Sequence, residues 1–518
     1  MSDAYEGARG KLVASLLGIV FVRLWLMPLG SSLWLDEIGT YWVTNARFTE
    51  IVPRAELFPQ SVPYAAIVWM VRALGGNSEI VLRLPSVLAA GLAVWLLYRL
   101  GLEFFDRETA FLAIVVFVGL PSIAFAAGDA RPYAFAVLTT IGALWMLVRW
   151  LERGRTIDAG GYVLFATATI YFHYLFATTL VAHAAYALSR WRRGARVPLT
   201  AVVVAAAAMA LLVAPGAILV VHMARDRAFH SYGRMPGIDS MLEALAPPIV
   251  LGALLLSVFV GWSLRPMMRL QPFPPARKSS GSQDGALGRV APQDALWLLS
   301  LSIGIPVALL AVASRATGTP VFHPRYMMCL DPAVALLAAW LLRTIQPDGV
   351  RRAVAACYLL IMFMTLGNVT RLGITHTKED WRAALQTVRT LTGQRPVLMS
   401  GIYIESDNLA WVQDARHLSY MRAPLDAYPT GGSAVVLPLR RDPGREAYVD
   451  RLLASTPGLE DRFILIDRSG QYSWAGWLDE RLGPKGYVIR QIGDFPPLRI
   501  WMFESRPTSG RGARYSPP

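Results

Sequence analysis

The sequence predicts a mainly α-helical, polytopic membrane protein with about eleven transmembrane helices, followed by a small α/β domain. Three observations predict this fold class. Hydrophobic residues make up 54% of the 518 residues and charged residues only 17%, whereas soluble domains carry about a quarter charged residues. Apolar runs long enough to cross a bilayer recur up to residue 371. Beyond residue 373 the apolar density falls, and short strand-like runs alternate with helix-like segments.

The clearest apolar runs each have the length of one transmembrane helix. They are 12–28, 79–99, 109–127, 132–150, 198–221, 247–264, 293–313, 327–343 and 353–371. The first is interpreted as a retained span, because it lacks a small-residue cleavage site and many similar segments follow it. The segment 160–189 is interpreted as two short helices that turn at His173, because arginines flank both of its ends. Basic flanks mark the cytoplasmic side, so we expect a cytoplasmic N-terminus and an outer C-terminus.

This topology divides the chain into a transmembrane domain, 1–372, and an extracytoplasmic α/β domain, 373–505. A first outer loop at 29–78 contains a predicted interfacial helix over Tyr64–Leu74. A cytoplasmic linker at 265–292 is rich in Pro, Ser, Gly and Arg, and the tail 506–518 is predicted to be disordered. The predicted elements of the α/β domain are a helix over Glu379–Leu391 and strands over Pro396–Ser400, Ala434–Leu439, Phe463–Asp467, Tyr487–Ile492 and Leu498–Phe503.

The net charge of +14 does not indicate a nucleic-acid-binding protein. The basic residues cluster in short segments between apolar runs, which is typical of positive-inside topology, and the sequence has no long basic helix pattern. The two cysteines, Cys329 and Cys357, lie in apolar stretches. Their placement excludes a disulfide framework and a cysteine-based metal knuckle.

Two adjacent carboxylates, Asp36 and Glu37, lie between Trp34 and Trp42, where the first span enters the outer loop. A charge at that depth is costly unless it is solvated or functional, and aromatic residues are enriched at the same depth. The placement predicts a reaction centre at the membrane surface. The alternative is that one carboxylate simply caps a loop helix.

Further polar residues that are distant in the sequence are predicted at the same outer boundary. They are Asp129, Arg131, Tyr133, His173, Tyr174, His323, Arg325 and Tyr326. A carboxylate can act there as general base toward an acceptor hydroxyl, and arginines can stabilise the leaving phosphate of a lipid-linked donor. Structural alternatives remain open: the arginines snorkel to headgroups, the histidine at 173 and the tyrosines are interfacial residues, and Asp129 is an ion-pair partner of Arg131.

Seven short motifs occur in order along the chain. They are Trp34-Leu-Asp36-Glu37, Pro63-Tyr64, Arg83-Leu-Pro-Ser86, Ala130-Arg131-Pro-Tyr133, His173-Tyr174, Pro324-Arg325-Tyr326 and Asp380-Trp381-Arg382. Together they resemble the bacterial GT-C membrane glycosyltransferases of the protein-mannosyltransferase-like group, which are glycosyltransferase family 39 and its aminoarabinose-transferase relatives. The resemblance covers residues 10–390.

The resemblance implies a GT-C fold in the bacterial cytoplasmic membrane. It also implies transfer of a single hexose or pentose from a polyprenyl-phosphate carrier to an outer-face acceptor, with inversion at the anomeric carbon. Asp36 would be the base, with Glu37 supporting it or binding metal, and Arg131 and Arg325 would lie near the donor phosphate. The remaining polar residues and Tyr64 would support them, and a divalent metal is an option, with Glu37 and His173 as candidate ligands.

The chain departs from the family where relatives have His-Pro-Pro before the loop tyrosine, because here the stretch is Gln60-Ser-Val-Pro-Tyr64. The role of that histidine is therefore not carried over. A transporter or flippase is the alternative class, although the sequence has no pair of matched broken helices in two halves. An oligosaccharyltransferase is disfavoured because Ser473–Asp479 is not a Trp-Trp-Asp signature. A non-catalytic scaffold protein is a further alternative if the acidic pair is dispensable for function. The sequence leaves open the acceptor (glycan, lipid or protein) and the oligomeric state.

Overall fold

The structure is a computed structural model that describes residues 2–58, 61–225, 235–245, 248–269, 290–370, 373–392, 395–400, 402–468 and 473–505. The chain divides into two compact units. The first comprises residues 1–31 and 47–376, and the second comprises residues 32–46 and 377–518. Residues 32–46, predicted as part of the first outer loop, therefore group with the carboxyl-terminal residues. Most of the predicted linker 265–292 and all of the predicted tail 506–518 lie outside the described residues.

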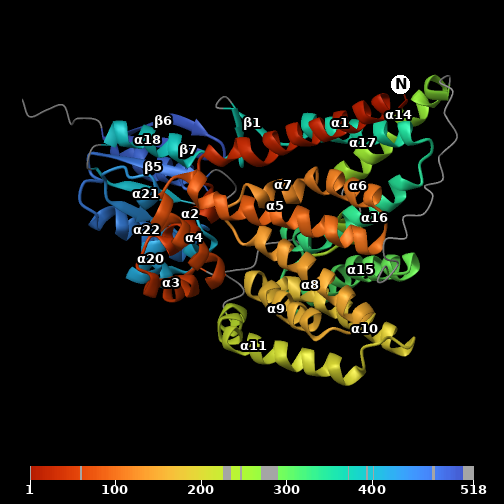
Figure 1. Cartoon of the computed structure of the whole chain (residues 1–518). Helices are drawn as coiled ribbons and strands as arrows, with labels where there is room; N and C mark the ends of the chain where they lie inside the picture. The colour runs from red at the N-terminus through yellow and green to blue at the C-terminus, as the bar shows by residue number, and fades with distance from the viewer. Residues whose placement is uncertain are drawn as a thin grey trace, which may run out of the picture. The chain divides into compact units, whose positions relative to one another are not determined.

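The first unit is almost entirely helical (Figure 1). Its longer helices are α1 (Ser2–Phe21), α5 (Glu79–Phe104), α8 (Tyr133–Arg153), α11 (Leu199–Arg225), α14 (Pro248–Arg269), α15 (Pro292–Thr317) and α17 (Asp348–Thr365). Its shorter helices are α3 (Ile51–Leu57), α4 (Val62–Gly75), α6 (Arg107–Val118), α7 (Pro121–Ala127), α9 (Thr156–Phe172), α10 (Thr178–Arg192), α13 (Ile238–Leu245) and α16 (Asp331–Arg343). A short antiparallel ribbon, β1 (Asn368–Thr370) with β2 (Gly373–Thr375), follows the last helix.

Within the described residues, six helices are long and apolar enough to cross a membrane, or up to eight if each of two bent helix pairs is one span. This is the helix content of a multi-pass membrane protein, so that part of the prediction is confirmed. The total of about eleven spans and the sidedness of the termini stay predictions.

Two predicted apolar segments are broken in the structure. The run predicted as one span over 109–127 forms α6 and α7, which are bent by 71°, because Pro121 lacks an N–H and holds the preceding Leu120 in an extended conformation. The segment 160–189 forms α9 and α10, and the extended backbone of His173 ends α9. The predicted turn at His173 is therefore confirmed. The second break places His173 at a helix end.

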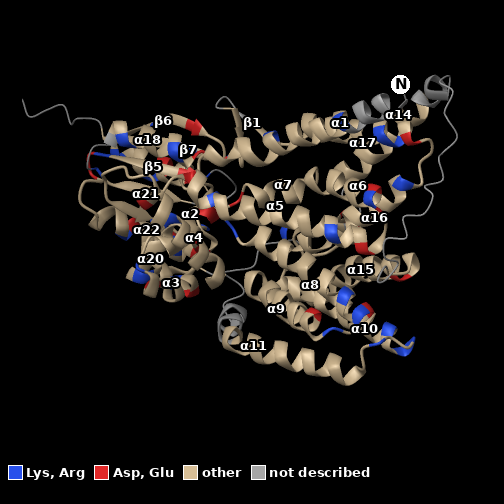
Figure 2. Cartoon of the chain, in the orientation of Figure 1, with Lys and Arg blue, Asp and Glu red and all other residues tan. Residues whose placement is uncertain are grey.

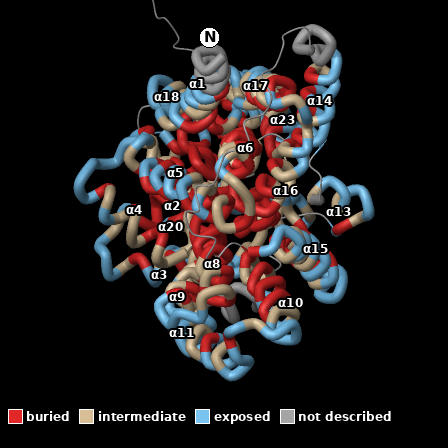
Figure 3. Tube along the Cα trace, turned by 45° about the vertical axis from the view of Figure 1, so that its right-hand side comes forward, coloured by how far each residue is buried: buried red, intermediate tan, exposed pale blue. Residues whose placement is uncertain are grey.

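The helices of the first unit differ strongly in burial. In the apolar 18-residue stretch of α8, 83% is buried inside the protein, whereas in the corresponding stretch of α11 only 6% is buried. Figure 3 shows the same contrast, with α8 mostly red and α11 mostly pale blue. The core of this unit therefore lies around α8, and α11 exposes most of its apolar surface.

The second unit is an α/β domain with a five-stranded sheet in the order β4-β3-β5-β7-β6. The strands are β3 (Val397–Ser400), β4 (Ala434–Val436), β5 (Arg462–Arg468), β6 (Tyr487–Phe495) and β7 (Leu498–Ser505). β3, β4 and β5 are parallel, and β7 pairs antiparallel with both β5 and β6. Its helices are α2 (Leu35–Thr44), α18 (Trp381–Thr392), α19 (Leu409–Gln413), α20 (Ala415–Met421), α21 (Ala423–Ala427), α22 (Pro443–Ser455) and α23 (Ala475–Leu482).

The predicted strands of this domain are all confirmed, and the predicted helix over Glu379–Leu391 is α18, which begins two residues later. Its apolar core includes Leu465, Trp474 and Phe503, all fully buried. Trp474 and Trp477 pack edge to face with their ring centroids 5.1 Å apart, an arrangement that stabilises cores. This sheet domain forms the scaffold against which α2 is held.

Candidate functional site

The acidic pair lies in the first turn of α2, and its two carboxylates differ in environment. Glu37 is fully buried, and its Oε2 accepts a hydrogen bond from the backbone N–H of Trp34 at 3.2 Å. This contact satisfies a donor at the start of the helix. Asp36 is half-buried. The capping alternative therefore applies to Glu37, and the role of Asp36 as the base stays a prediction.

Helix α2 is anchored to the carboxyl-terminal residues of the second unit at both of its ends. The backbone N–H of Leu33 donates to the hydroxyl of Tyr428 at 2.9 Å. Near the other end, the indole Nε1 of Trp42 donates to Ser419 Oγ at 3.3 Å. The Trp42 ring also packs against Tyr420, with centroids 5.7 Å apart. The position of Asp36 is therefore set by contacts with residues nearly four hundred positions later.

The central anchor of α2 is Glu379, a buried carboxylate. Its Oε2 accepts from the backbone N–H of Leu35 at 3.2 Å and from Trp381 Nε1 at 3.1 Å. Its Oε1 accepts from Arg468 Nη2 at 2.6 Å. A buried carboxylate that receives several donors forms a rigid connection, and here it fixes the residue directly before Asp36. Glu379 is therefore a candidate positioning residue.

Replacing Glu379 by alanine is expected to loosen the start of α2, because the N–H groups of Leu35 and Trp381 lose their acceptor. Each unsatisfied buried donor costs about 1–3 kcal/mol. We expect a lower unfolding temperature and a lower rate of the reaction proposed below. Glu379→Gln keeps an acceptor oxygen and should recover part of the rate. The control is Glu480→Gln, which removes an exposed carboxylate, and the rates of all three variants are measured. If Glu379→Gln and Glu379→Ala lose the same rate at equal stability, the positioning role is wrong.

In the first unit, a buried carboxylate in the loop after α7 lies beside a buried histidine that follows β2. Asp129 is fully buried, and its Oδ1 lies 3.5 Å from Nε2 of His376. The His376 ring packs on Phe125 with centroids 4.5 Å apart, and the guanidinium of Arg325 lies over the same phenyl ring at 5.4 Å. Phe125 therefore contacts both the guanidinium of Arg325 and the imidazole that lies beside Asp129.

A second cluster of the first unit surrounds His173, where α9 ends. Its ring lies 5.3 Å from that of Tyr133 and 5.2 Å from that of Tyr326, and it stacks on Tyr174 at 5.9 Å. The His323 ring lies 5.4 Å from Tyr326. Five predicted residues from three distant segments therefore form one aromatic cluster. His173 is enclosed by rings, and its role as a metal ligand stays a prediction.

Arg131 is connected to Tyr64 through Ser86. The hydroxyl of Ser86 donates to the carbonyl oxygen of Arg131 at 3.3 Å and lies 3.1 Å from the hydroxyl of Tyr64. The guanidinium of Arg131 lies over the ring of Phe58 at 5.2 Å. Two of the short sequence motifs, at Pro63-Tyr64 and at Ser86, therefore serve to hold the backbone of Arg131.

The structure also assigns contacts to residues that were not candidate site residues, among them Arg83 of the motif Arg83-Leu-Pro-Ser86. Arg83 is fully buried and donates to the carbonyl oxygens of Leu29 at 2.9 Å and Ser31 at 2.7 Å, so it fixes the end of the first span. His376 and Glu379 were not selected either. The only sequence signal for them was that both closely precede the Asp380-Trp381-Arg382 motif, because their partners lie far away in the chain.

Comparison with known proteins agrees with the fold. Residues 60–218 match the family model described as dolichyl-phosphate-mannose-protein mannosyltransferase. ArnT from Cupriavidus metallidurans bound to undecaprenyl phosphate is similar, with a TM-score of 0.54 and 12% identity over 96% of this chain and 98% of that chain. Apo ArnT from the same organism has a TM-score of 0.50 and 13% identity over the same shares. No curated protein matches the sequence.

The chain thus has a fold similar to that of ArnT, and its apolar helices are those of a multi-pass membrane protein. The family match confirms the resemblance to protein-mannosyltransferase-like glycosyltransferases over residues 60–218, which contain four of the seven motifs. Tyr64, Arg131, Tyr133 and His173 lie within the matched stretch.

Proposed function

We propose that this protein is an inverting glycosyltransferase that moves a single sugar from a polyprenyl-phosphate carrier to an acceptor at the outer face of the bacterial cytoplasmic membrane. The match of residues 60–218 to the mannosyltransferase family model carries the proposal. The similarity to ArnT, which was solved with undecaprenyl phosphate bound, supports a lipid-phosphate donor. The transporter alternative has no comparable support.

The proposed reaction is one displacement at the anomeric carbon of the sugar. The acceptor hydroxyl oxygen forms a bond to the anomeric carbon of the sugar, and its proton passes to the carboxylate of Asp36 as general base. The bond between the anomeric carbon and the phosphate oxygen breaks, and the lipid phosphate leaves with the electron pair. Arg131 and Arg325 stabilise the charge that develops on that phosphate.

The remaining candidates have supporting roles in this proposal. Glu37 holds the start of α2 through the Trp34 N–H. Tyr64 supports Arg131 through Ser86. The rings of Tyr133, His173, Tyr174, His323 and Tyr326 pack into one aromatic cluster, to which we assign a supporting role. A divalent metal stays an option, and within the first unit Asp129 and His376 offer a carboxylate and an imidazole, both of which suit such an ion.

The test is to delete the gene and to extract lipid-linked sugars and glycoconjugates from the mutant. We expect one polyprenyl-phosphate sugar to accumulate and one glycoconjugate to lose a single sugar, and these two changes name the donor and the acceptor. Expression of the intact chain should reverse both changes. Accumulation of a complete lipid-linked glycan on the cytoplasmic side of the membrane, with no sugar missing from it, would instead favour the flippase alternative.

A further inference from the structure

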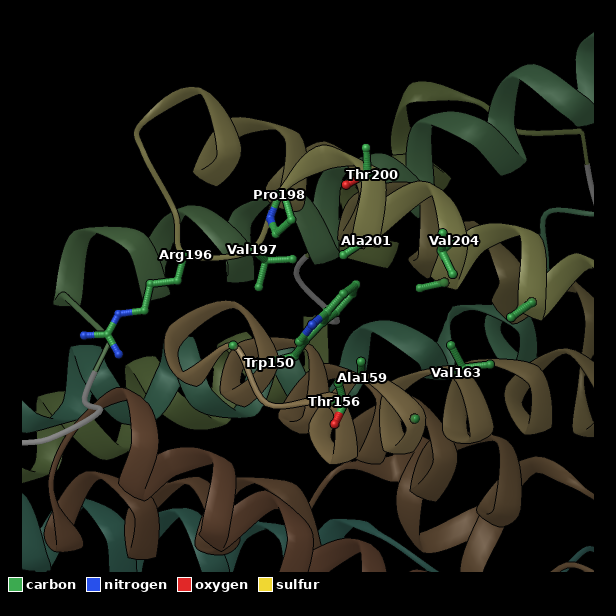
Figure 4. Close-up of a pocket in the computed structure, with 14 residues that line it drawn as sticks. Trp150, Thr156, Ala159, Val163, Arg196, Val197, Pro198, Thr200, Ala201 and Val204 are labelled. Carbon is green, nitrogen blue, oxygen red and sulfur yellow. The ribbon is translucent and has the colours of Figure 1, made fainter.

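A groove of about 500 Å³ lies on the first unit between the end of α8, the first turns of α9 and the beginning of α11. Figure 4 shows Trp150 in the middle of this groove, with Arg196 toward one end and Val163 and Val204 toward the other. Most of the remaining lining residues are glycine and alanine. The groove is therefore apolar along most of its length and basic at one end.

Helices α9 and α11 are in close contact where α9 ends. There the hydroxyl of Tyr171 donates to the carbonyl oxygen of Leu212 at 2.9 Å. A Cβ atom on Gly216 would lie 2.8 Å from the Tyr171 ring, so the two helices touch at this point. Near the start of α11, small side chains such as Ala201 and Ala205 leave the space open. Since only 6% of the apolar stretch of α11 is buried, the groove opens beside an exposed apolar helix that is long enough to cross a bilayer.

At the basic end of the groove, some arginines pair with acidic side chains and others do not. Four arginines of this region pair with acidic side chains, namely Arg149 with Asp158, Arg153 with Glu103, Arg190 with Glu152 and Asp294, and Arg193 with Asp294. Within the described residues, Arg196 and Arg155 have no such partner. Arg155 lies between Gly154 and Thr156, which both line the groove. Figure 2 shows blue residues beside the start of α11, while its described turns are tan.

We propose that this groove binds one anionic phospholipid of the bilayer. An acyl chain lies along Trp150, Ala201 and Val204, and the phosphate of the headgroup pairs with Arg196 and Arg155. Charge complementarity selects an anionic lipid, because a zwitterionic headgroup would leave the two arginines without net compensation. Basic residues at the membrane surface attract anionic lipid with about 1 kcal/mol each, which corresponds to about fivefold in affinity. The site does not depend on the proposed transferase activity.

The test is native mass spectrometry of the purified full-length chain after lipid removal, with phosphatidylglycerol or phosphatidylcholine of identical acyl chains added back. We expect one phosphatidylglycerol to be retained at least about fivefold better than phosphatidylcholine. Arg196→Glu should remove this preference, and Ala201→Trp should remove the retained lipid because the indole fills the groove. Val203→Trp is the matched control, since Val203 is exposed on the same helix and does not line the groove.

Two results would overturn the proposal. One is equal retention of the two lipids by the wild-type chain. The other is unchanged retention of phosphatidylglycerol in Ala201→Trp. If Ala201→Trp does not fold, the Arg196→Glu variant decides the question, because residue 196 precedes α11 and its side chain is exposed. An undiminished preference in that variant also contradicts the assignment of the headgroup to Arg196.

Discussion

Replacement of Asp36 by asparagine is expected to lower the rate of sugar transfer by about 10²–10⁴-fold, which is the usual contribution of a general base. The amide has nearly the same size as the carboxylate and is tolerated in the first turn of a helix, but it does not accept the hydroxyl proton. The protein should therefore remain folded and membrane-inserted. The measurement is the initial rate of transfer by the purified chain in vesicles, with the donor that accumulates in the deletion strain.

Two variants separate this role from the general loss of a negative charge. Glu37→Gln keeps an oxygen that can accept from the Trp34 N–H, so we expect it to lose less than about tenfold. Glu480→Gln removes an exposed carboxylate from α23 of the same unit and should leave the rate unchanged. Full activity of Asp36→Asn would refute the assignment of Asp36 as the base. The role that the resemblance implies for this motif would then be wrong.

Replacement of Arg325 by alanine is expected to weaken use of the lipid-linked donor by about 10- to 100-fold, the value of a charge-assisted hydrogen bond to phosphate. The effect should appear in the KM for the donor and in kcat, because the charge on the phosphate increases in the transition state. The KM for the acceptor should not change. Steady-state rates with each substrate varied in turn measure this difference.

Arg325→Lys provides the conservative comparison, because lysine keeps the charge but lacks the planar fork of the guanidinium. It should recover only part of the loss. Arg107→Ala is the control, since Arg107 is an exposed arginine at the start of α6. An unchanged KM for the donor in Arg325→Ala would remove this residue from the phosphate site and favour the alternative that it snorkels to the lipid headgroups.

Much of the fold was predictable because its signals are local. Runs of apolar residues with basic flanks predicted the spanning helices, and the arginines on both sides of 160–189 predicted the turn at His173. In the carboxyl-terminal domain, the alternation of short apolar runs with turn residues predicted each strand of the sheet. The break between α6 and α7 was missed, although Gly119 and Pro121 signal it, because the run is apolar on both sides of the bend.

The sequence by itself determined the membrane class, the elements of the sheet domain and the short motifs that contain the candidate residues, because hydropathy and motif order are properties of neighbouring residues. Only the tertiary structure decided that residues 32–46 group with the carboxyl-terminal residues. It also decided that Glu379 holds the start of α2 and that His376 lies beside Asp129. These contacts join residues hundreds of positions apart. No local pattern encodes such pairs, since they form only when separate helices and strands pack against one another.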